Sequence, residues 1–187
     1  MRVDTVNEPP GLSGITHEDA VKRFAEMWNT CSEEAEKEGV LITWEFEPGF
    51  VINKPHEIQR LVSLVDHQNF SILFDTCHAY MCAVSGSRQE EPKDILPGGV
   101  AEFAILLRGK IGYVHLFDSA GTLHDGWTST HAAFGTGAID FDTALQAILD
   151  SGYAGDWWTI DLCFRPDAWE LLEESKNFVE DLLRKML

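Results

Sequence analysis

Short apolar runs alternate along this chain with longer segments in which apolar residues recur every three or four positions. Four runs have the length and the β-branched or aromatic content of buried strands, namely Val40–Glu45, Ser71–Asp75, Ile111–Phe117 and Trp157–Asp161. Arg2–Val6 has the same character. The segments between the runs have the period of amphipathic helices. The pattern therefore predicts five strand–helix units and a parallel α/β fold.

Capping residues and turn formers mark the ends of the predicted helices. Thr16 is placed to cap the first helix, and Gly39 is placed to end it. Pro55 favours the first turn of the second helix. Asp140 is a good cap for a later helix that Gly152 closes. Each of these helices follows a predicted strand, as repeated strand–helix units require.

Two further helices and two long connections complete the prediction. One helix is expected at Val100–Leu107, and a final one begins at Pro166. The segments Ala79–Gly99 and Asp118–Ile139 are expected to be loops, and loops of this length are usually functional or disordered. The inward face of the final helix is predicted to carry Trp169, Leu172, Phe178 and Leu182.

Four of the predicted strands run directly into a side chain that can bind a metal: Glu45, Asp75, His115 and Asp161. In parallel α/β proteins the chemistry lies beyond the carboxyl ends of the strands. Neighbouring strands are about 4.8 Å apart, so four ends in a flat sheet would spread over roughly 14 Å. One cation binds its ligands at roughly 2.0 to 2.6 Å. If the four side chains share a cation, the sheet must therefore curve as in a barrel.

Composition narrows the function classes. The 187 residues, 44% of them hydrophobic, suit a single domain over residues 1–187 with a real core. The 31 acidic against 14 basic residues give a net charge of -17, which disfavours nucleic acid as a partner. The four cysteines lack the spacing of a zinc–thiolate site or a disulfide framework. No apolar run reaches the roughly 20 residues of a membrane span and no leader opens the chain, so a cytoplasmic location without membrane contact is expected.

The motifs around these side chains resemble those of the xylose-isomerase-like barrels. This superfamily contains sugar and sugar-phosphate isomerases and epimerases, inosose dehydratases and AP-endonucleases of family 2 type. Its epimerases hold a cation with Glu, Asp, His and Glu in chain order, and Glu45, Asp75 and His115 match the first three by position and flanking residues. Asp161 stands in the fourth place and is one methylene shorter than Glu. Phe134–Gly137 resembles the glycine turn that follows the seventh strand of the family.

The resemblance implies a partial (β/α)8 TIM barrel, with about five parallel strands and the helices outside. The chain would correspond to strands four to eight, so the first three βα units would be absent and the chain would be a truncated product or a fragment. Open edges at Arg2–Val6 and Trp157–Asp161 would then invite pairing with another chain. Either a homodimer or a separate amino-terminal piece would close the barrel.

The chemistry that the resemblance implies is proton transfer next to a carbonyl of a small sugar or sugar phosphate. Mn²⁺ or Mg²⁺ suits the oxygen-rich ligands and would stabilise the enediolate, and the imidazole also admits Co²⁺ or Zn²⁺. Glu45 and Asp161 would be the catalytic acid and base on opposite faces of the substrate. The substrate-binding residues are predicted to be His78, Glu47, Asp118 and His131.

Several alternatives remain open at this stage. A dehydratase acting on a keto-cyclitol would use the same cation and enolate, and a truncated barrel fragment would keep the ligands with little activity. An AP-endonuclease would need more metal ligands and a basic groove, which the acidic balance opposes. Acids such as Glu45 and Asp75 also cap helices or form surface ion pairs, and His115 also suits a hydrogen-bonded core position. Glu47 and Asp118 are equally compatible with orienting roles or with exposed loops.

Overall fold

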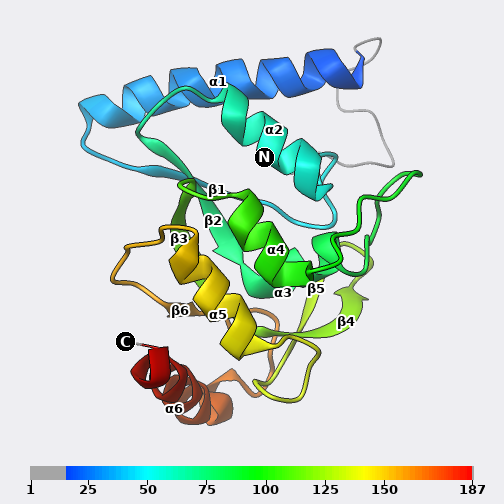
Figure 1. Ribbon diagram of the computed structural model, residues 1–187, viewed down its shortest axis with the longest axis vertical. Coiled ribbons are helices and arrows are strands. Elements are labelled where there is room, and N and C mark those ends of the chain that lie inside the picture. Colours follow the sequence, from blue (N-terminus) through cyan, green and yellow to red (C-terminus); the bar gives the residue numbers. More distant parts are fainter. Residues whose placement is uncertain (1–15, 187) are drawn as a thin grey trace.

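A parallel four-stranded sheet lies at the centre of the molecule (Figure 1). The computed structural model describes residues 16–186, so the predicted strand Arg2–Val6 lies outside the described residues. The strands are β1 (Ile42–Glu45), β2 (Phe70–Asp75), β3 (Ile111–Leu116) and β6 (Thr159–Ile160), in the order β1-β2-β3-β6. The predicted parallel α/β architecture is confirmed for this range, although β6 is shorter than the strand expected at Trp157–Asp161.

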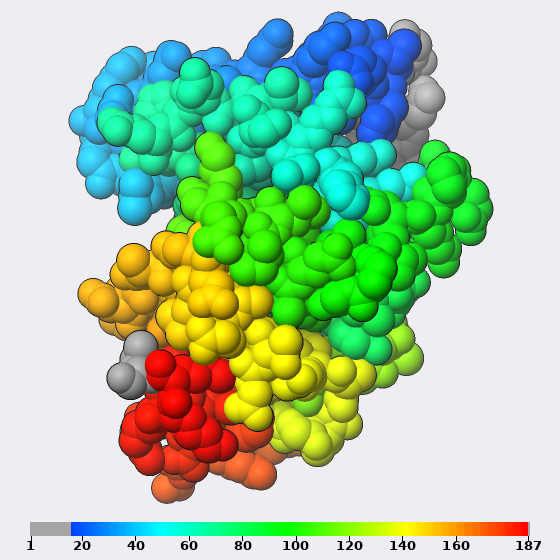
Figure 2. All heavy atoms as spheres, viewed as in Figure 1, coloured from blue at the N-terminus to red at the C-terminus, as the bar shows by residue number. Residues whose placement is uncertain are grey.

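Six helices are found within residues 16–186, and most of them connect consecutive strands of the sheet. They are α1 (His17–Lys37), α2 (Pro55–Leu64), α3 (Thr76–Ala83), α4 (Gly99–Leu106), α5 (Phe141–Asp150) and α6 (Ala168–Met186). In Figure 1, α1 packs on α2, and α4 packs on α5. Figure 2 shows α1 and α6 at opposite ends of the molecule.

The predicted capping residues act as expected. The Thr16 side chain accepts a hydrogen bond from the Asp19 backbone at 3.1 Å, and the Asp140 side chain accepts one from the Thr143 backbone at 3.2 Å. Gly39 follows α1 with φ at +67°, a conformation that glycine adopts without steric cost. Sequence signals therefore located the starts of α1 and α5 and the end of α1.

The loop predicted at Ala79–Gly99 is confirmed over residues 84–98, which contain neither helix nor strand, whereas the prediction of a loop at Asp118–Ile139 was wrong. α3 occupies the start of the first segment, and nearly all of its residues are buried, which removes the amphipathic period that sequence reasoning relies on. The second contains a hairpin of β4 (Asp118–His124) and β5 (Thr128–Ala132). Its turn carries Asp125 and Gly126 with φ at +49° and +74°, and Asp-Gly is a known hairpin signal.

The inward face predicted for α6 is confirmed in its second half only. Leu182 is buried and Phe178 packs against the core. Trp169 and Leu172 are 86% and 45% exposed, which corrects the prediction for these two residues.

The aromatic core supports the ends of β1 and β2. Phe46, Phe74 and Phe103 are fully buried, with ring centroids 4.9 to 5.8 Å apart. Burying each such ring contributes roughly 1.5 to 3 kcal/mol. Phe46 and Phe74 are chain neighbours of Glu45 and Asp75, so this cluster fixes the backbone from which both carboxylates project.

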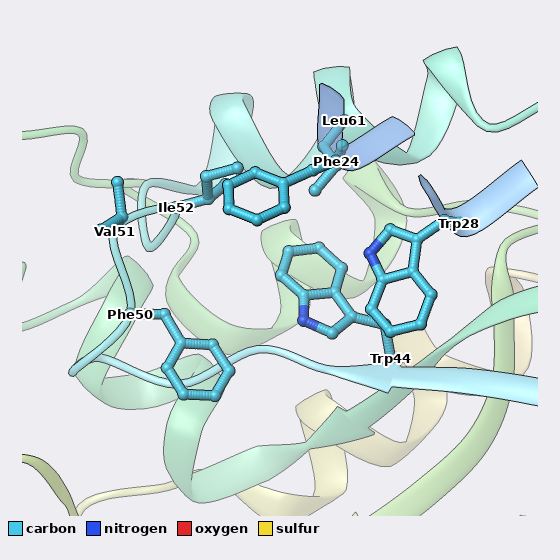
Figure 3. A pocket seen from close by; sticks show the side chains of 7 residues that line it. All are labelled: Phe24, Trp28, Trp44, Phe50, Val51, Ile52 and Leu61. Atoms are coloured by element: carbon cyan, nitrogen blue, oxygen red, sulfur yellow. The ribbon is translucent and has the colours of Figure 1, made fainter. Parts of the chain in front are cut away.

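A small apolar pocket lies where α1 and α2 cover β1 (Figure 3). Phe24 and Trp28 of α1 face Trp44 of β1 across it. Its volume is about 20 Å³, whereas sites for small molecules usually measure about 300 to 1,000 Å³. The pocket is therefore a packing gap between helix and sheet.

Candidate metal centre

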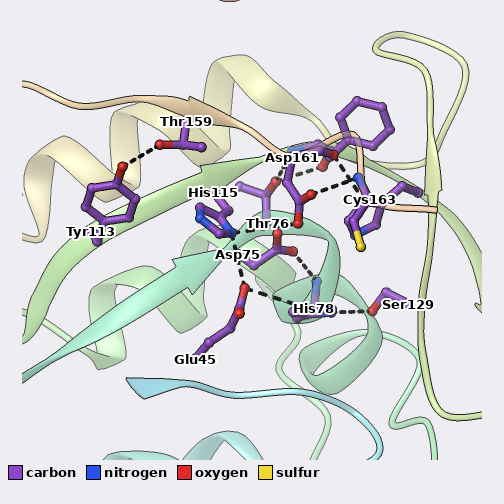
Figure 4. Close-up of polar contacts among 12 residues, drawn as sticks. Glu45, Asp75, Thr76, His78, Tyr113, His115, Ser129, Thr159, Asp161 and Cys163 are labelled. Atoms are coloured by element: carbon purple, nitrogen blue, oxygen red, sulfur yellow. Dashed lines mark hydrogen bonds and ion pairs between the residues drawn. The ribbon is translucent and has the colours of Figure 1, made fainter. Parts of the chain in front are cut away.

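Four side chains converge just beyond the carboxyl ends of the four parallel strands (Figure 4). Glu45, Asp75, His115 and Asp161 each offer one ligand atom, and these four atoms all lie within 4.8 Å of one another. Glu45 and Asp161 come from the two outer positions of the sheet, β1 and the residue after β6. A flat sheet would separate them by roughly 14 Å. The sheet is therefore strongly curved, as in a barrel.

Asp75 joins the helix α3 to this cluster. Its side chain is fully buried, and its Oδ1 accepts the backbone N–H of His78 at 2.7 Å as the cap of α3. Its Oδ2 is buried and has no hydrogen-bond partner. Burial raises the pKa of Asp75, although the nearby His78 and His131 oppose this shift. A buried acceptor without a partner is costly, and a cation beside Oδ2 would remove that cost.

His115 lies between two carboxylates of the cluster. Its Nδ1 is 3.2 Å from Glu45 Oε1 and 3.7 Å from Asp161 Oδ2. Burial alone would lower the pKa of His115, but the contact with Glu45 and the charges of the surrounding carboxylates outweigh it and raise the pKa. Burial alone would raise the pKa of Glu45, but the contact with His115 and the charges of His78 and other histidines lower it. The cluster therefore favours positive charge at its centre.

The donor set fits a hard divalent cation. The set comprises one imidazole and three carboxylates, one of which is Asp75 with its unpartnered Oδ2. Oxygen-rich sets of this kind suit Mn²⁺ or Mg²⁺, while the imidazole admits Zn²⁺ or Co²⁺. Glu45, His115 and Asp161 are partly exposed, at 32%, 21% and 21% of their side-chain surface. Such a cation would therefore be held by a buried carboxylate on one side and would remain accessible to a small molecule on the other.

Two histidines predicted to bind substrate lie beside this cluster. His78, His131 and Asp75 form a second group whose ligand atoms lie within 4.8 Å of one another, and all three are buried. His78 Nδ1 is 2.8 Å from Ser129 Oγ, and His78 Nε2 is 3.9 Å from Glu45 Oε1. The structure thus brings both histidines to the edge of the four-ligand cluster, and their binding of substrate remains a prediction.

Asp118 is buried among backbone hydrogen bonds and does not lie exposed in a loop. It is 1% exposed, and its two oxygens accept backbone N–H groups of four residues, at 2.8 to 3.1 Å. These four donors are Ser119, Gly135, Gly137 and Ile139. The geometry favours a role in fixing the glycine turn over the predicted binding of substrate. Glu47, two residues beyond β1, is half-buried and belongs to neither group of potential ligands.

Two supporting residues escaped sequence reasoning. The Thr76 hydroxyl donates to the Phe117 carbonyl at 2.7 Å and accepts from the Phe117 N–H at 3.0 Å, which ties the ends of β2 and β3 together. Cys163 N–H donates to Asp161 Oδ1 at 2.8 Å. The Asp-x-Cys spacing is that of an Asx turn, so the sequence contains a signal for the Cys163 contact. The hydrogen bonds of Thr76 join it to Phe117, 41 positions away, and no local signal reveals them.

The curved parallel sheet with acidic and imidazole ligands at its carboxyl end defines a TIM-barrel-like protein with a candidate metal centre. The chain belongs to the xylose isomerase-like TIM barrel family, whose profile matches residues 1–182. This finding confirms the resemblance derived from the motifs around Glu45, Asp75 and His115.

Among curated proteins, inosose dehydratases are similar to this chain. The inosose dehydratase of Klebsiella pneumoniae (strain 342) is 28% identical over 159 residues, which is 77% of this chain and 48% of that protein. The inosose dehydratase of Lacticaseibacillus casei is 27% identical over 155 residues, covering 76% of this chain and 47% of that protein. The chain spans about half the length of the curated relatives that it matches.

Solved structures of the same superfamily share the fold. The IOLI protein with a zinc atom superposes with a TM-score of 0.68 at 24% identity, over 94% of this chain and 60% of that one. A D-tagatose 3-epimerase-like protein superposes with a TM-score of 0.66 at 24% identity, over 95% of this chain and 61% of that one. Within residues 16–186, none of the helices combines the length and the apolar character needed to cross a bilayer.

Proposed function

We propose that Glu45, Asp75, His115 and Asp161 hold one divalent cation and that the protein catalyses proton transfer next to a carbonyl of a small polyhydroxylated substrate. The observation that carries this proposal is the convergence of four ligand atoms within 4.8 Å of one another, one of them from Asp75, whose buried Oδ2 has no hydrogen-bond partner. Enzymes among the relatives and the shared family fold support it. When bound, such a cation would polarise the carbonyl and stabilise the enediolate that proton removal creates.

Proton transfer is assigned to the two carboxylates at the outer positions of the sheet. Glu45 and Asp161 reach the cluster from opposite ends of the strand order, and both are partly exposed. The lowered pKa of Glu45 keeps it ionised at neutral pH and able to accept a proton. General acid–base help of this kind contributes roughly 100- to 10,000-fold. Removal of a proton on one face and return on the other gives an epimer.

Substrate hydroxyl groups are assigned to His78 and His131. Both rings are buried beside Asp75, and each has one ring nitrogen engaged by the protein, at Ser129 Oγ and at the Asp161 carbonyl. Nε2 of His131 is assigned to a substrate oxygen, and so is Nε2 of His78, which also lies 3.9 Å from Glu45 Oε1. This arrangement suits a sugar, a sugar phosphate or a cyclitol, and the leading assignment is an isomerase or epimerase.

A second candidate is a dehydratase acting on a keto-cyclitol. The specific observation in its favour is that the curated relatives described above are inosose dehydratases. Both reactions begin with removal of the proton next to the carbonyl and differ in the next bond. Return of a proton to the carbon completes epimerisation, whereas loss of the neighbouring hydroxyl as water completes dehydration.

This chain spans about half the length of the curated relatives that it matches. That the chain is active by itself is therefore also part of the proposal. Correspondence with strands four to eight of the family barrel and closure of the sheet by a second chain both remain predictions. If substrate contacts from the rest of a complete barrel are indispensable, the third candidate holds, namely a fragment that binds the cation with little turnover.

The test combines metal analysis with hydrogen exchange. Purified protein is equilibrated with Mn²⁺, Mg²⁺, Co²⁺ or Zn²⁺, and a panel of ketoses and inososes is then incubated with it in D₂O. We expect one ion per chain and metal-dependent deuterium incorporation next to the carbonyl, both lost in Glu45→Gln. Mass analysis separates an epimer, which gains only the mass of the exchanged deuterium, from a product that has lost water. One bound ion without deuterium incorporation supports the fragment, and metal content unchanged by Glu45→Gln and His115→Ala refutes the site.

A further inference from the structure

Asp161 follows the shortest strand of the sheet. β6 pairs with β3 through two residue pairs only, whereas β1 and β2 pair through four. β6 is also the last strand in the order of the described sheet. Strand pairing gives Asp161 a single backbone hydrogen bond, from its N–H to the Leu116 carbonyl at 3.2 Å. Strand pairing alone therefore holds Asp161 less firmly than it holds Glu45 or Asp75.

A side chain from the β4–β5 hairpin gives the backbone of Asp161 a second hydrogen bond. Nδ1 of His131, on β5, lies 3.1 Å from the Asp161 carbonyl oxygen. A carbonyl can only accept a hydrogen bond, so Nδ1 must carry the proton and Nε2 must be the unprotonated nitrogen of the neutral ring. His131 is 6% exposed, and its ring packs against Phe117 with the centroids 5.2 Å apart. Both the orientation and the tautomer of the ring are thus specified.

The chain after Asp161 is tied to the same hairpin residue. Arg165 Nη1 donates to the His131 carbonyl at 3.4 Å, while Arg165 Nη2 contacts Asp167 at 2.6 Å. Between these points, the Cys163 N–H holds Asp161 Oδ1 and leaves Oδ2 facing His115 at 3.7 Å. His131 therefore contacts this segment on both sides of the turn that orients the Asp161 carboxylate.

We propose that His131 is a positioning residue for the fourth ligand: its Nδ1–H fixes the backbone of Asp161 and so directs Oδ2 into the cluster. This inference rests on the proposed metal centre and deepens it, and it is separate from the substrate contact assigned to Nε2. Partners that orient metal ligands in this way typically change metal affinity by about 10- to 100-fold when they are removed.

Two substitutions separate the roles of the two ring nitrogens. In His131→Asn the amide nitrogen lies near the position of Nδ1 and can still donate to the Asp161 carbonyl, whereas in His131→Gln the amide reaches only the position of Nε2. We expect Mn²⁺ affinity, measured by calorimetry, to fall by about 10- to 100-fold in His131→Gln and by less than about threefold in His131→Asn. His56→Asn is the matched control, because His56 also pairs through Nδ1, with Asp94 at 2.8 Å, on the surface of α2.

A second readout requires no metal. Nitrogen NMR of the metal-free protein should show neutral His131 protonated at Nδ1. Protonation at Nε2 would overturn the inference, as would equal losses of Mn²⁺ affinity in His131→Asn and His131→Gln or no loss in either. Thermal unfolding of each variant separates loss of affinity from loss of fold. Metal binding without deuterium exchange would count against the proposed reaction and would leave this inference standing, so the two failures are distinguishable.

Discussion

Asp75 and His78 are joined by a 2.7 Å hydrogen bond in which the Asp75 carboxylate caps the helix that carries the histidine. The cap uses Oδ1 and leaves the buried Oδ2 without a partner. One carboxylate thus begins α3, places the His78 ring beside the cluster and directs its second oxygen toward the candidate cation. The Asp-Thr-x-His motif therefore has a physical explanation in the joint demands of capping and ligation.

The first prediction concerns this shared carboxylate. Asp75→Asn keeps an oxygen that can cap α3 but removes the negative charge and one oxygen ligand. We expect the helix to remain and bound Mn²⁺ per chain to fall below detection, measured by elemental analysis after dialysis. Asp66→Asn, an exposed acid after α2, is the matched control and should keep the metal content of the parent. Retained stoichiometric Mn²⁺ in Asp75→Asn would remove Asp75 from the ligand set.

The second prediction concerns the Thr76 bridge between β2 and β3. Thr76→Val keeps the shape of the side chain but leaves the N–H and carbonyl of Phe117 without their hydroxyl partner in a buried position. We expect the free energy of unfolding in urea to fall by about 1 to 3 kcal/mol. Thr76→Ser, which keeps the hydroxyl, should lose distinctly less. A larger loss in Thr76→Ser than in Thr76→Val would show that the methyl group, rather than the hydroxyl, matters.

The third prediction separates the two roles considered for Asp118. Its carboxylate accepts four backbone N–H groups in and around the glycine turn, and hydrogen bonds to a charged group contribute about 1.5 to 3 kcal/mol each. Asp118→Ala should therefore unfold at a clearly lower urea concentration while binding Mn²⁺ with the parent stoichiometry at low temperature. A variant as stable as the parent would contradict the structural role and would favour the predicted substrate contact.

A related steric test uses Gly137. A Cβ at this position would lie 2.3 Å from Asp118 Oδ1 and 2.5 Å from the Ser119 carbonyl oxygen. Gly137→Ala must therefore displace either the carboxylate or the turn, and we expect a loss of stability comparable with that of Asp118→Ala. Because the two changes disrupt one network, the double variant should lose less than the sum of the two single losses. Additive losses would indicate two independent effects.

The fourth prediction concerns pH and the cap of α5. The hydrogen bonds of the Asp140 carboxylate with Thr143 lower its pKa from the ordinary 3.8. A lowered pKa in the folded state means that the stabilisation is present above the unfolded value and is lost as the pH falls through the folded value. Asp140→Ala should cost about 1 kcal/mol at pH 7 and less as the solution is acidified below pH 3.8.

Asp140→Asn serves as the control for that experiment. Asparagine caps helices about as well as aspartate but does not titrate, so its stability at pH 7 should be close to that of the parent. The difference between Asp140→Asn and Asp140→Ala should then stay constant across the acidic range. If the stability difference between Asp140→Asn and Asp140→Ala shrinks at low pH, a group other than the Asp140 carboxylate causes the pH dependence, because neither variant carries that carboxylate.

Much of the fold was predictable because local signals and global structure agree. Thr16 and Asp140 cap the helices that were expected to begin there, and the apolar runs before Glu45, Asp75 and His115 are strands. The sequence also predicted that the sheet must curve if the four side chains meet, and they do meet. These features depend on contacts within one strand–helix unit or between neighbouring strands.

The remaining features depend on distant contacts. Nearly all residues of α3 are buried, so no amphipathic period identifies it, and the helical period of α6 does not show that Trp169 is exposed. The contact of His131 with Asp161 joins residues 30 positions apart through a hairpin that was expected to be a loop. Tertiary arrangement, rather than local propensity, decides each of these.

The most direct test of the metal centre is a crystal structure of the protein soaked in Mn²⁺, with anomalous scattering used to locate the ion. We expect one anomalous peak at the carboxyl end of the sheet, within about 2.0 to 2.6 Å of an atom from each of Glu45, Asp75, His115 and Asp161. A peak bound by other residues, or no peak at saturating Mn²⁺, would contradict the proposed metal centre.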